Sequence, residues 1–435
     1  MKKFIRTFVV AALGMGAMSL SACDNVKAAE YQAGNPVKVG LICLHDNQST
    51  YDKNFIDALN VAVGNLGTEV DGEPIVKTGI AENQDCYNAA KDLVKQGCNV
   101  IFADSFGHEP FMLKAAQKWP QVQFCHATGT QALVAGVRNY HNAFASIYEG
   151  RYLAGYAAGL KLVTMVDSLK PNNFDANGNI KLGYIGAYQY AEVISGYTSW
   201  YLGVKAAMEE NNAPGVVMDV TFTRSWYDFD AEEAGARTLI TNGAALISQH
   251  ADSMGAPGEC EKQRVPDVGY NVSTAEACPN TYVAHSRINW APYYENVIGS
   301  MYAGTAITGE VNNNYTGTIG TGSVEFDVKD PIAKAACLLV EAQLIAGTRR
   351  VFDCSKFTVT VDAEHFINAN ATVDANGHLT HYNADVRDMG DYAGDTEAVV
   401  SRGGITYFDE SASRSAPYFD LTIDGITLLN SGFDD

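Results

Sequence analysis

Short apolar runs alternate with segments of helical periodicity from residue 37 to about residue 350. This rhythm predicts parallel strands, because two parallel strands are joined through a crossover that is usually a helix. About 400 residues follow the N-terminal segment, more than one hydrophobic core normally serves. We therefore predict an α/β fold with two doubly wound parallel-sheet domains joined by a hinge. Two such domains form a clamp that closes on a ligand between them.

The expected domain boundaries follow from the order of these elements. The first ligand-binding lobe is expected to comprise residues 37–142 and 281–312, and the second lobe residues 143–280 and 313–350. A weak strand is expected at 134–138, and the strand at 282–288 is expected to return the chain to the first lobe. Residues 351–435 are interpreted as a C-terminal β-rich extension, and residues 23–36 as a tether.

Three segments expected at strand ends bring large aromatic side chains next to small hydrogen-bonding groups. They are Ser225-Trp226-Tyr227-Asp228, Gln249-His250-Ala251-Asp252-Ser253 and Asn289-Trp290-Ala291-Pro292-Tyr293-Tyr294. In an open α/β sheet, ligands bind outside the carboxyl ends of the strands. The aromatics therefore favour a flat ligand that is held by stacking, with polar groups contacting its edge.

The first 22 residues are interpreted as a targeting segment. Lys2, Lys3 and Arg6 precede an apolar run that is too short to span a bilayer as a helix. The run ends in Leu20-Ser21-Ala22-Cys23, which resembles the bacterial lipobox. That resemblance implies that Cys23 is lipidated and becomes the mature N-terminus. The alternative is an ordinary secretory peptide that is cut near Ala29.

The lipobox resemblance also implies a location. Asp24 follows the cysteine, which in bacteria with two membranes is typical of lipoproteins retained on the inner membrane. The expected location is extracytoplasmic, on the periplasmic side of that membrane and held there by lipid. No later stretch is apolar enough to span a bilayer.

The charge of the chain limits its partners. The formal charge is −20, and removal of residues 1–22 takes away three basic and no acidic residues, which lowers it to −23. Such a surface repels nucleic acid and disfavours a phosphorylated ligand. A neutral or cationic small molecule is the expected partner.

Eight cysteines remain when Cys23 is set aside, and an even count in an exported protein permits disulfides. The pairs closest in sequence are Cys86/Cys98, Cys260/Cys278 and Cys337/Cys354. Free buried thiols are the alternative. No CxxC pair and no His/Cys spacing typical of zinc is present, so neither a metal nor a cofactor is expected.

Several motifs occur together in an order that resembles the basic membrane protein (Bmp) family. The motifs are Asp52-Lys53-Asn54-Phe55, the runs at 101–107 and 124–129, the helix at 147–155, and the segments around Trp226, His250 and Trp290. The resemblance covers about residues 37–350. It implies a type I periplasmic binding protein-like fold and a substrate-binding lipoprotein that captures purine nucleosides or related compounds for an ABC permease.

The resemblance also implies site residues. Phe55 and Trp226 would stack on the two faces of a purine, although Phe55 lies four residues after Tyr51 and could instead belong to the helix core. The other candidates for ligand contact are Asp46, Ser105, Phe106, Asp252, Asn271 and Trp290. Asp252 could instead cap the following helix, and Trp290 could pack under the helix that it begins.

Two positions depart from the family's nucleoside-binding branch. Asn271 stands where that branch has an aspartate for the ribose hydroxyls, and Ile288 stands where it has a lysine. Both departures favour a nucleobase or another flat ring over an intact nucleoside.

Two other classes of function were weighed. A nucleoside-processing enzyme would need an acid cluster with a hard cation near the first strand. No DxD pattern follows that strand, and the sequence has no Gly-x-Ser-x-Gly elbow and no Walker loop. No catalytic residue is therefore assigned. A receptor for a sugar or signal molecule on the same fold remains open, because sugar pockets also use aromatic residues.

Overall fold

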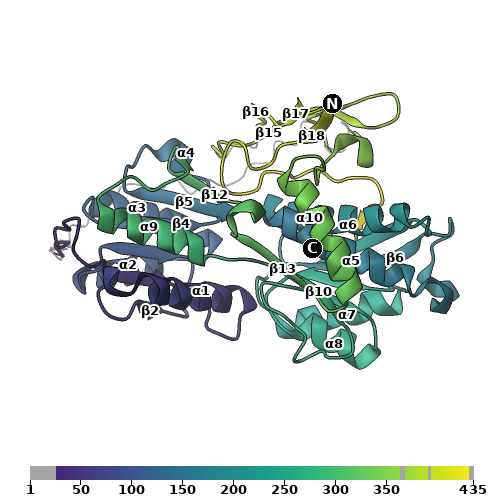
Figure 1. Cartoon of the computed structure of the whole chain (residues 1–435), viewed down its shortest axis with the longest axis horizontal. Coiled ribbons are helices and arrows are strands. Elements are labelled where there is room, and N and C mark those ends of the chain that lie inside the picture. The colour runs from purple at the N-terminus through teal and green to yellow at the C-terminus, as the bar shows by residue number, and fades with distance from the viewer. Residues whose placement is uncertain (1–25, 363–367, 390–392, 431–435) are drawn as a thin grey trace, which may run out of the picture.

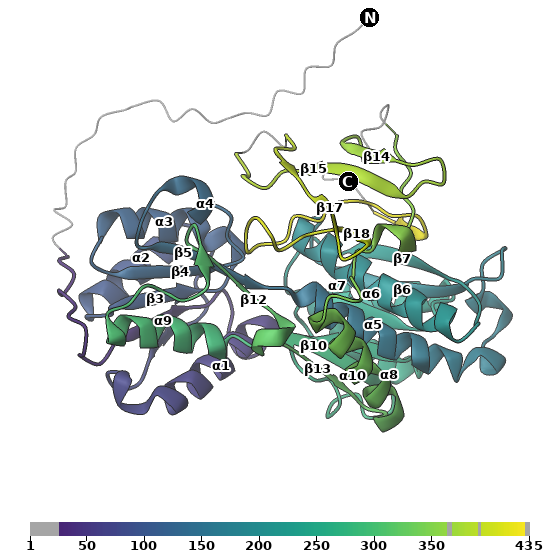
Figure 2. The same cartoon turned by 45° about the horizontal axis from the view of Figure 1, so that its top comes forward.

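The computed structural model describes residues 26–362, 368–389 and 393–430. Two seven-stranded sheets lie next to each other, and a smaller β-rich segment lies above both in Figures 1 and 2. The strand orders are β11-β12-β5-β4-β3-β1-β2 and β13-β10-β9-β8-β6-β7-β19. The predicted fold class is confirmed. Cys23 lies outside the described residues.

The first lobe consists of residues 37–145 and 291–317. Its strands are β1 (Val39–Ile42), β2 (Ile75–Lys77), β3 (Val100–Ala103), β4 (Gln123–Ala127), β5 (Tyr140–Ala145), β11 (Glu310–Val311) and β12 (Asn314–Gly317). Its helices are α1 (Thr50–Leu66), α2 (Gln84–Lys95), α3 (Glu109–Lys118), α4 (Ala132–Ala135) and α9 (Ala291–Ala303). The short helix α4 occupies the place of the strand predicted at 134–138, and Gly136 ends it with φ 63°.

Helices cover both faces of the first sheet because both faces of its central strands are apolar. Leu41 and Phe102, which are register partners, contribute to the core shared with α1 and α9. Ile42 and Ile101 point the other way and contribute to the core shared with α2 and α3. Buried strands of this kind are typical of a parallel, doubly wound sheet.

The second lobe consists of residues 147–288 and 324–345, with one strand added from residues 426–428. Its strands are β6 (Ile180–Gly186), β7 (Val216–Phe222), β8 (Ile247–His250), β9 (Asp267–Tyr270), β10 (Tyr282–Ile288), β13 (Val324–Val328) and β19 (Ile426–Leu428). Its helices are α5 (Ile147–Val163), α6 (Ala191–Glu210), α7 (Phe229–Thr241), α8 (Gly255–Gln263) and α10 (Pro331–Ile345). Short 3-10 turns lie at Gly67–Glu69, Phe106–His108, Val166–Ser168, Pro171–Asn173, Ile319–Thr321 and Cys354–Lys356.

Two glycines allow α5 and α6 to pack against each other at close range. A Cβ atom at Gly155 would collide with the carbonyl oxygen of Trp200, and one at Gly203 would collide with that of Tyr152. The two helices therefore approach backbone to backbone. This contact fixes the middle of α6 against α5.

The chain crosses between the lobes at three places, after β5, after β10 and after β12. Two of the expected boundaries are shifted. The strand at 282–288 was expected in the first lobe, but β10 pairs with β9 and β13 in the second sheet. Residues 314–317 were expected in the second lobe, but β12 pairs with β5 in the first sheet. An apolar pattern predicts that a strand is buried, but it does not indicate which of the two sheets the strand joins.

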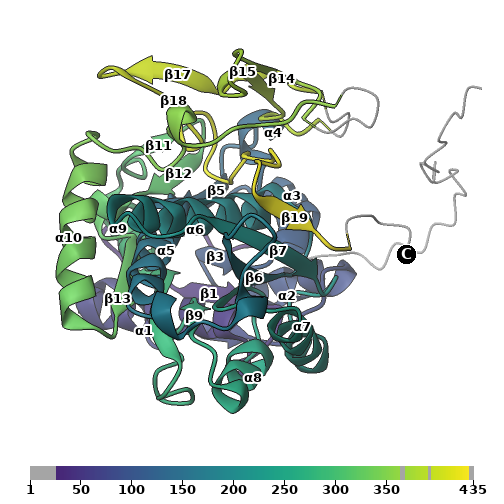
Figure 3. The ribbon, with the colours of Figure 1, turned by 90° about the vertical axis from the view of Figure 1, so that its right-hand side faces the viewer.

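The C-terminal extension, residues 351–430, is β-rich as expected and touches both lobes. Its strands before β19 are β14 (Ala371–Val373), β15 (Leu379–Ala384), β16 (Thr396–Glu397), β17 (Val399–Arg402) and β18 (Ile405–Phe408). Thr130 Oγ1 in the first lobe donates to Asp388 Oδ2 at 2.9 Å, and Ser195 Oγ in α6 donates to Glu410 Oε2 at 2.6 Å. Strand β19 then joins the second sheet in parallel beside β7 (Figure 3).

All eight cysteines within the described residues are buried free thiols. None of the three cysteine pairs closest in sequence is bonded in the described part of the chain, in line with the alternative of free buried thiols.

Candidate ligand site between the lobes

A cavity lies where the carboxyl ends of the strands of the two sheets face each other. Its empty volume is about 380 Å³, including its opening to solvent. The first lobe contributes Leu44, His45, Tyr51, Asp52, Ser105, Phe106 and Thr128, and the second lobe contributes Glu192, Trp226, His250, Asp252 and Tyr270. This is the position at which open α/β sheets bind their ligands.

The lobes are closed over this cavity. The Thr50 amide at the start of α1 donates to the Asp252 carbonyl oxygen across the cleft at 2.9 Å. The rings of Phe106 and Tyr190, one from each lobe, lie 5.2 Å apart. The walls of the cavity therefore exist as a unit only in the closed arrangement.

Four aromatic rings line the cavity from both lobes, namely Tyr51, Phe106, Trp226 and Tyr270. Tyr51 is held in place by a hydrogen bond from its hydroxyl to the Asp104 carbonyl oxygen at 2.8 Å. The half-buried Trp226 makes an edge contact with Tyr188 at 5.2 Å. Rings fixed in this way can hold a flat ligand by stacking without losing much conformational freedom when it binds.

Asp252 places a carboxyl in the wall, where the Tyr270 hydroxyl and His250 Nδ1 also have no hydrogen-bond partner in the described part of the chain. It is 5 % exposed, and its carboxyl makes no hydrogen bond with any residue that the structure describes. Burial, together with the charges of Asp52 and Glu232, raises its pKa well above the usual range. A buried carboxyl without a hydrogen bond destabilises the folded protein. Asp252 can therefore form a hydrogen bond with a polar edge of a ligand.

In the second lobe, polar and charged side chains surround the Tyr270 ring. His250 Nε2 lies 3.4 Å from Glu192 Oε1, and the His250 ring lies 4.6 Å from the Tyr270 ring. Burial lowers the pKa of His250. The guanidinium of the fully buried Arg151 lies 4.3 Å from the centre of the Tyr270 ring. Tyr270 is thus held between a cation and an imidazole.

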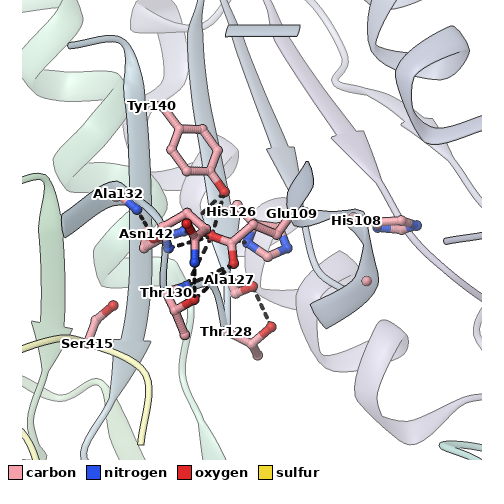
Figure 4. Close-up of polar contacts among 12 residues, drawn as sticks. His108, Glu109, His126, Ala127, Thr128, Thr130, Ala132, Tyr140, Asn142 and Ser415 are labelled. Atoms are coloured by element: carbon pink, nitrogen blue, oxygen red, sulfur yellow. Dashed lines mark hydrogen bonds and ion pairs between the residues drawn. The ribbon is translucent and has the colours of Figure 1, made fainter. Parts of the chain in front are cut away.

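A polar network centred on Glu109 fixes the loop that carries Thr128 (Figure 4). The Glu109 carboxylate accepts hydrogen bonds from the Thr130 amide at 3.0 Å, from the Tyr140 hydroxyl at 2.9 Å and from Asn142 Nδ2 at 3.1 Å. Thr128 adopts φ 66°, a left-handed conformation that is uncommon for a β-branched residue. The network keeps this strained residue in the cavity wall.

The family of the chain follows from its match to known proteins. The model of the Bmp family, described as ABC transporter substrate-binding protein PnrA-like, matches residues 39–337, more than half of the chain. The chain belongs to the Bmp family. The family predicted from the sequence motifs is therefore confirmed.

Two relatives of stated specificity resemble this Bmp-family chain. A purine-binding protein of Brucella abortus is 27% identical over 282 residues, which are 65% of this chain and 70% of that protein. A putative ABC transporter glucose-binding protein of Haloferax volcanii is 26% identical over 207 residues, 48% of this chain and 47% of that protein. This chain thus spans about half the length of the second relative.

Solved structures resemble the fold. An ABC transporter solute-binding protein from Conexibacter woesei has a TM-score of 0.54 at 18% identity, over 72% of this chain and 98% of that one. One from Aeropyrum pernix has a TM-score of 0.57 at 12% identity, over 76% and 95%. ABC substrate-binding proteins are extracytoplasmic. Among the helices of the described residues, none has the length and apolar character needed to cross a membrane.

Four of the predicted contact residues of this Bmp-family protein line the cavity: Ser105, Phe106, Trp226 and Asp252. Ser105 Oγ donates to Glu82 Oε1 at 2.6 Å, which leaves only its lone pairs for a ligand. Asp252 makes no capping bond, because the amide of Gly255 at the start of α8 is bonded by Ser253 Oγ. The capping alternative for Asp252 is therefore excluded.

The other four predicted residues lie elsewhere. Phe55 and Trp290 are each 2 % exposed and stack on each other at 4.4 Å, inside the core between α1 and α9. Asp46 is exposed, and its carboxylate accepts the Gln48 amide at 2.9 Å. Asn271 is buried directly after Tyr270 with φ 64° and does not line the cavity. The helix geometry explains Phe55, since Tyr51 one turn earlier is the residue that reaches the cavity.

The sequence motifs contained several lining residues that were not singled out. Tyr51 precedes the Asp52-Lys53-Asn54-Phe55 motif, Tyr270 precedes Asn271, and Thr128 lies within the 124–129 run. Tyr51 lies four residues before the predicted contact Phe55, and Tyr270 lies one residue before the predicted contact Asn271. Glu192 had no such signal, because the turn between β6 and α6 carries no recognisable motif.

Proposed function

We propose that this protein captures a purine nucleobase or nucleoside in the cavity between its lobes and delivers it to the permease of an ABC importer. The observation that carries the proposal is an aromatic-lined cavity with the buried, unpartnered carboxyl of Asp252 in its wall. A purine is a flat ring with N–H groups along its edge, which can donate to such a carboxyl. The similarity to the purine-binding protein of Brucella abortus supports the same class of ligand.

A nucleobase fits this wall better than an intact nucleoside. The two positions at which the family's nucleoside-binding branch carries ribose contacts hold Asn271 and Ile288, and both side chains are buried outside the cavity lining. No ribose contact is therefore assigned. We expect bases to bind at least as tightly as their nucleosides.

The proposed activity is binding without turnover. The Bmp family is described as substrate-binding, and no catalytic residue is assigned among the residues that line the cavity. Purine nucleosides incubated with the protein should therefore be recovered unchanged by chromatography.

Isothermal titration calorimetry with adenine, guanine, hypoxanthine and their nucleosides tests the proposal. We expect dissociation constants in the micromolar range or tighter, equivalent to about −8 kcal/mol. Nucleotides should bind far more weakly, because the net negative charge of the protein repels their phosphate groups. Glucose and pentoses form the second arm, motivated by the putative glucose-binding relative. Tight sugar binding without purine binding would reject the proposal in favour of a sugar receptor.

We further propose that lipid on Cys23 holds the protein at the periplasmic face of the inner membrane. The lipobox-like run that ends at Cys23 and the Asp24 that follows it support this location. In that position the lobes stay close to the membrane-embedded permease.

A further inference from the structure

A cysteine and two aspartates converge behind the wall of the cavity. Strands β1 and β3 are neighbours, and the residues that follow their last register pair, Cys43 and Asp104, lie next to each other at the sheet edge. Asp52 approaches them from the first turn of α1. The ligand atoms of the three side chains lie within 4.8 Å of one another, and each residue is at most 1 % exposed. The family match does not assign a role to this cluster.

The charge of this cluster is not balanced by any basic side chain nearby. Within the described residues, the ion-pair partners of Asp52 and Asp104 are the histidines His45 and His108, and no lysine or arginine pairs with either acid. Two adjacent buried carboxyls cannot both be ionised without a compensating cation. A metal ion or a shared proton must therefore accompany them.

Two buried atoms around this cluster have no hydrogen-bond partner in the described part of the chain. They are Asp104 Oδ2 and His108 Nδ1, and both residues are 0 % exposed. His108 Nδ1 lies 3.9 Å from Asp104 Oδ1. His108 Nε2 lies 2.8 Å from the Ile80 carbonyl oxygen, an acceptor, so Nε2 carries the ring proton and donates. The lone pair of Nδ1 therefore points to the cluster, in the arrangement typical of a metal-binding histidine.

We infer that Cys43, Asp52 and Asp104, with His108 beside Asp104, form a binding site for a zinc-class divalent cation behind the ligand cavity. A thiolate and two carboxylates with an adjacent imidazole are donors that suit Zn²⁺, whereas Mg²⁺ and Ca²⁺ prefer oxygen ligands alone. Binding releases the thiol proton of Cys43 and any proton shared by the two carboxyls. Because Asp52 also lines the cavity, the ion would tie the cavity wall to the sheet edge.

Metal titration of the full-length protein, prepared without an affinity tag, tests this inference. After treatment with chelator, the protein is titrated with Zn²⁺ and, separately, with Cd²⁺, whose bond to a thiolate absorbs in the ultraviolet. We expect one Zn²⁺ per chain to survive dialysis, a cadmium–thiolate band that saturates at one equivalent, and a higher thermal midpoint with Zn²⁺.

Three variants locate the site. Cys43→Ser should lose the cadmium band and weaken Zn²⁺ binding at least tenfold. Cys337→Ser, which removes an equally buried thiol from α10 of the second lobe, should keep both. Asp104→Asn preserves the side-chain shape and should bind Zn²⁺ at least tenfold more weakly while its circular dichroism is unchanged. If Cys43→Ser does not fold, the Zn²⁺ affinity of Asp104→Asn is the measurement that tests the site.

Two results would overturn the inference. If the wild-type protein retains no Zn²⁺, a proton shared between the carboxyls balances the cluster. If Cys43→Ser or a folded Asp104→Asn binds Zn²⁺ as tightly as the wild type, the ion lies elsewhere. Purine binding is not needed for any of these readouts, so they are independent of the proposed function.

Discussion

Two tryptophans of this chain occur in similar strand-end segments but have opposite environments. Trp226 is half-buried in the cavity wall, whereas Trp290 is 2 % exposed and stacks on Phe55. A matched pair of substitutions therefore separates ligand binding from stability.

Trp226→Ala should weaken purine binding by about 1–3 kcal/mol, because one stacking face is lost. Its thermal midpoint without ligand should change little. Trp290→Ala should instead lower the midpoint strongly, as large-to-small changes in a core cost about 3–5 kcal/mol. Calorimetry and thermal unfolding of both variants check this. An intact affinity together with a lowered midpoint for Trp226→Ala would mean that Trp226 is a core residue.

Asp252→Asn tests the polar contact in the cavity. The amide has the shape of the carboxyl but a different arrangement of donors and acceptors, so we expect purine affinity to fall by about 0.5–1.5 kcal/mol, the range for a hydrogen bond between neutral groups, because the raised pKa of Asp252 favours its neutral form. Asp46→Asn, which changes an exposed acid outside the cavity, is the control and should bind normally. Equal affinities of the two variants would remove Asp252 from the site.

Cys23→Ser tests the membrane anchor. The substitution removes the sulfur that would carry lipid, so the protein should move from the membrane fraction to the soluble fraction after cell lysis. Immunoblotting of both fractions measures the change. Cys337→Ser, in α10 of the second lobe, is the control for the loss of a cysteine elsewhere. An unchanged membrane fraction for Cys23→Ser would contradict the lipobox interpretation.

At this scale the sequence predicted the neighbourhood of the cavity better than its individual contacts. The segments that contain Ser105, Trp226 and Asp252 were identified because strand ends and turn residues leave a pattern. The sequence could not tell whether Tyr51 or Phe55 lines the cavity, because the two residues lie one turn apart on the same helix and their side chains contact each other. That choice depends on packing with α9, which lies more than two hundred residues further along the chain.

At the level of elements, the contact between the extension and α6 should make stability depend on pH. Burial raises the pKa of Glu410 to about 7, although its carboxyl accepts hydrogen bonds from Ser195 and from the Phe419 amide. The protonated form is favoured in the folded state. Its contribution to stability is therefore complete below the usual glutamate pKa of about 4.5 and is lost as the pH rises through about 7.

Glu410→Gln should remove this dependence. Relative to the wild type, the variant should gain up to about 3 kcal/mol of unfolding free energy between pH 5 and pH 8, because no buried charge forms. Urea unfolding at the two pH values measures the change. Glu73→Gln, at an exposed position, should show the same pH dependence as the wild type. A Glu410→Gln variant that follows the wild type at both values would mean that Glu410 is ionised at little cost.

The order and type of most elements could be predicted, and their assignment to a lobe could not. The alternation of strands and helices predicted from residue 37 to about residue 350 is present in both lobes. Strands β10 and β12 each belong to the other sheet than predicted. The hydrogen-bonded neighbours of a strand decide its sheet, and the sequence of a single strand does not identify those neighbours.

For the molecule as a whole, the extension connects the two lobes beside the cavity. It bonds Thr130, two residues beyond the lining residue Thr128, and Ser195, three residues beyond the lining residue Glu192. Opening of the clamp would have to stretch or break one of these contacts. The extension lies outside the matched family region of residues 39–337.

Asp388→Ala should therefore speed ligand release. The substitution removes the bond to Thr130 and leaves the attachment to the second lobe in place, so the first lobe should open several times more often. Stopped-flow fluorescence of Trp226 during displacement of a bound purine gives the dissociation rate. Asp424→Ala, which removes bonds to Thr358 and Thr360 within the extension, is the control. Identical rates for the two variants would show that the contact with Thr130 does not restrain opening.

The position of β19 has a consequence for how the protein is made. The second sheet ends at β7 until residues 426–428 arrive, although its other strands lie between residues 180 and 328. A newly exported chain emerges N-terminus first, so the edge of β7 keeps an open row of backbone N–H and C=O groups while the residues between β7 and β19 follow. Such an edge can pair with any extended chain nearby. We expect the new chain to be most prone to such pairing in this interval, which the arrival of β19 ends.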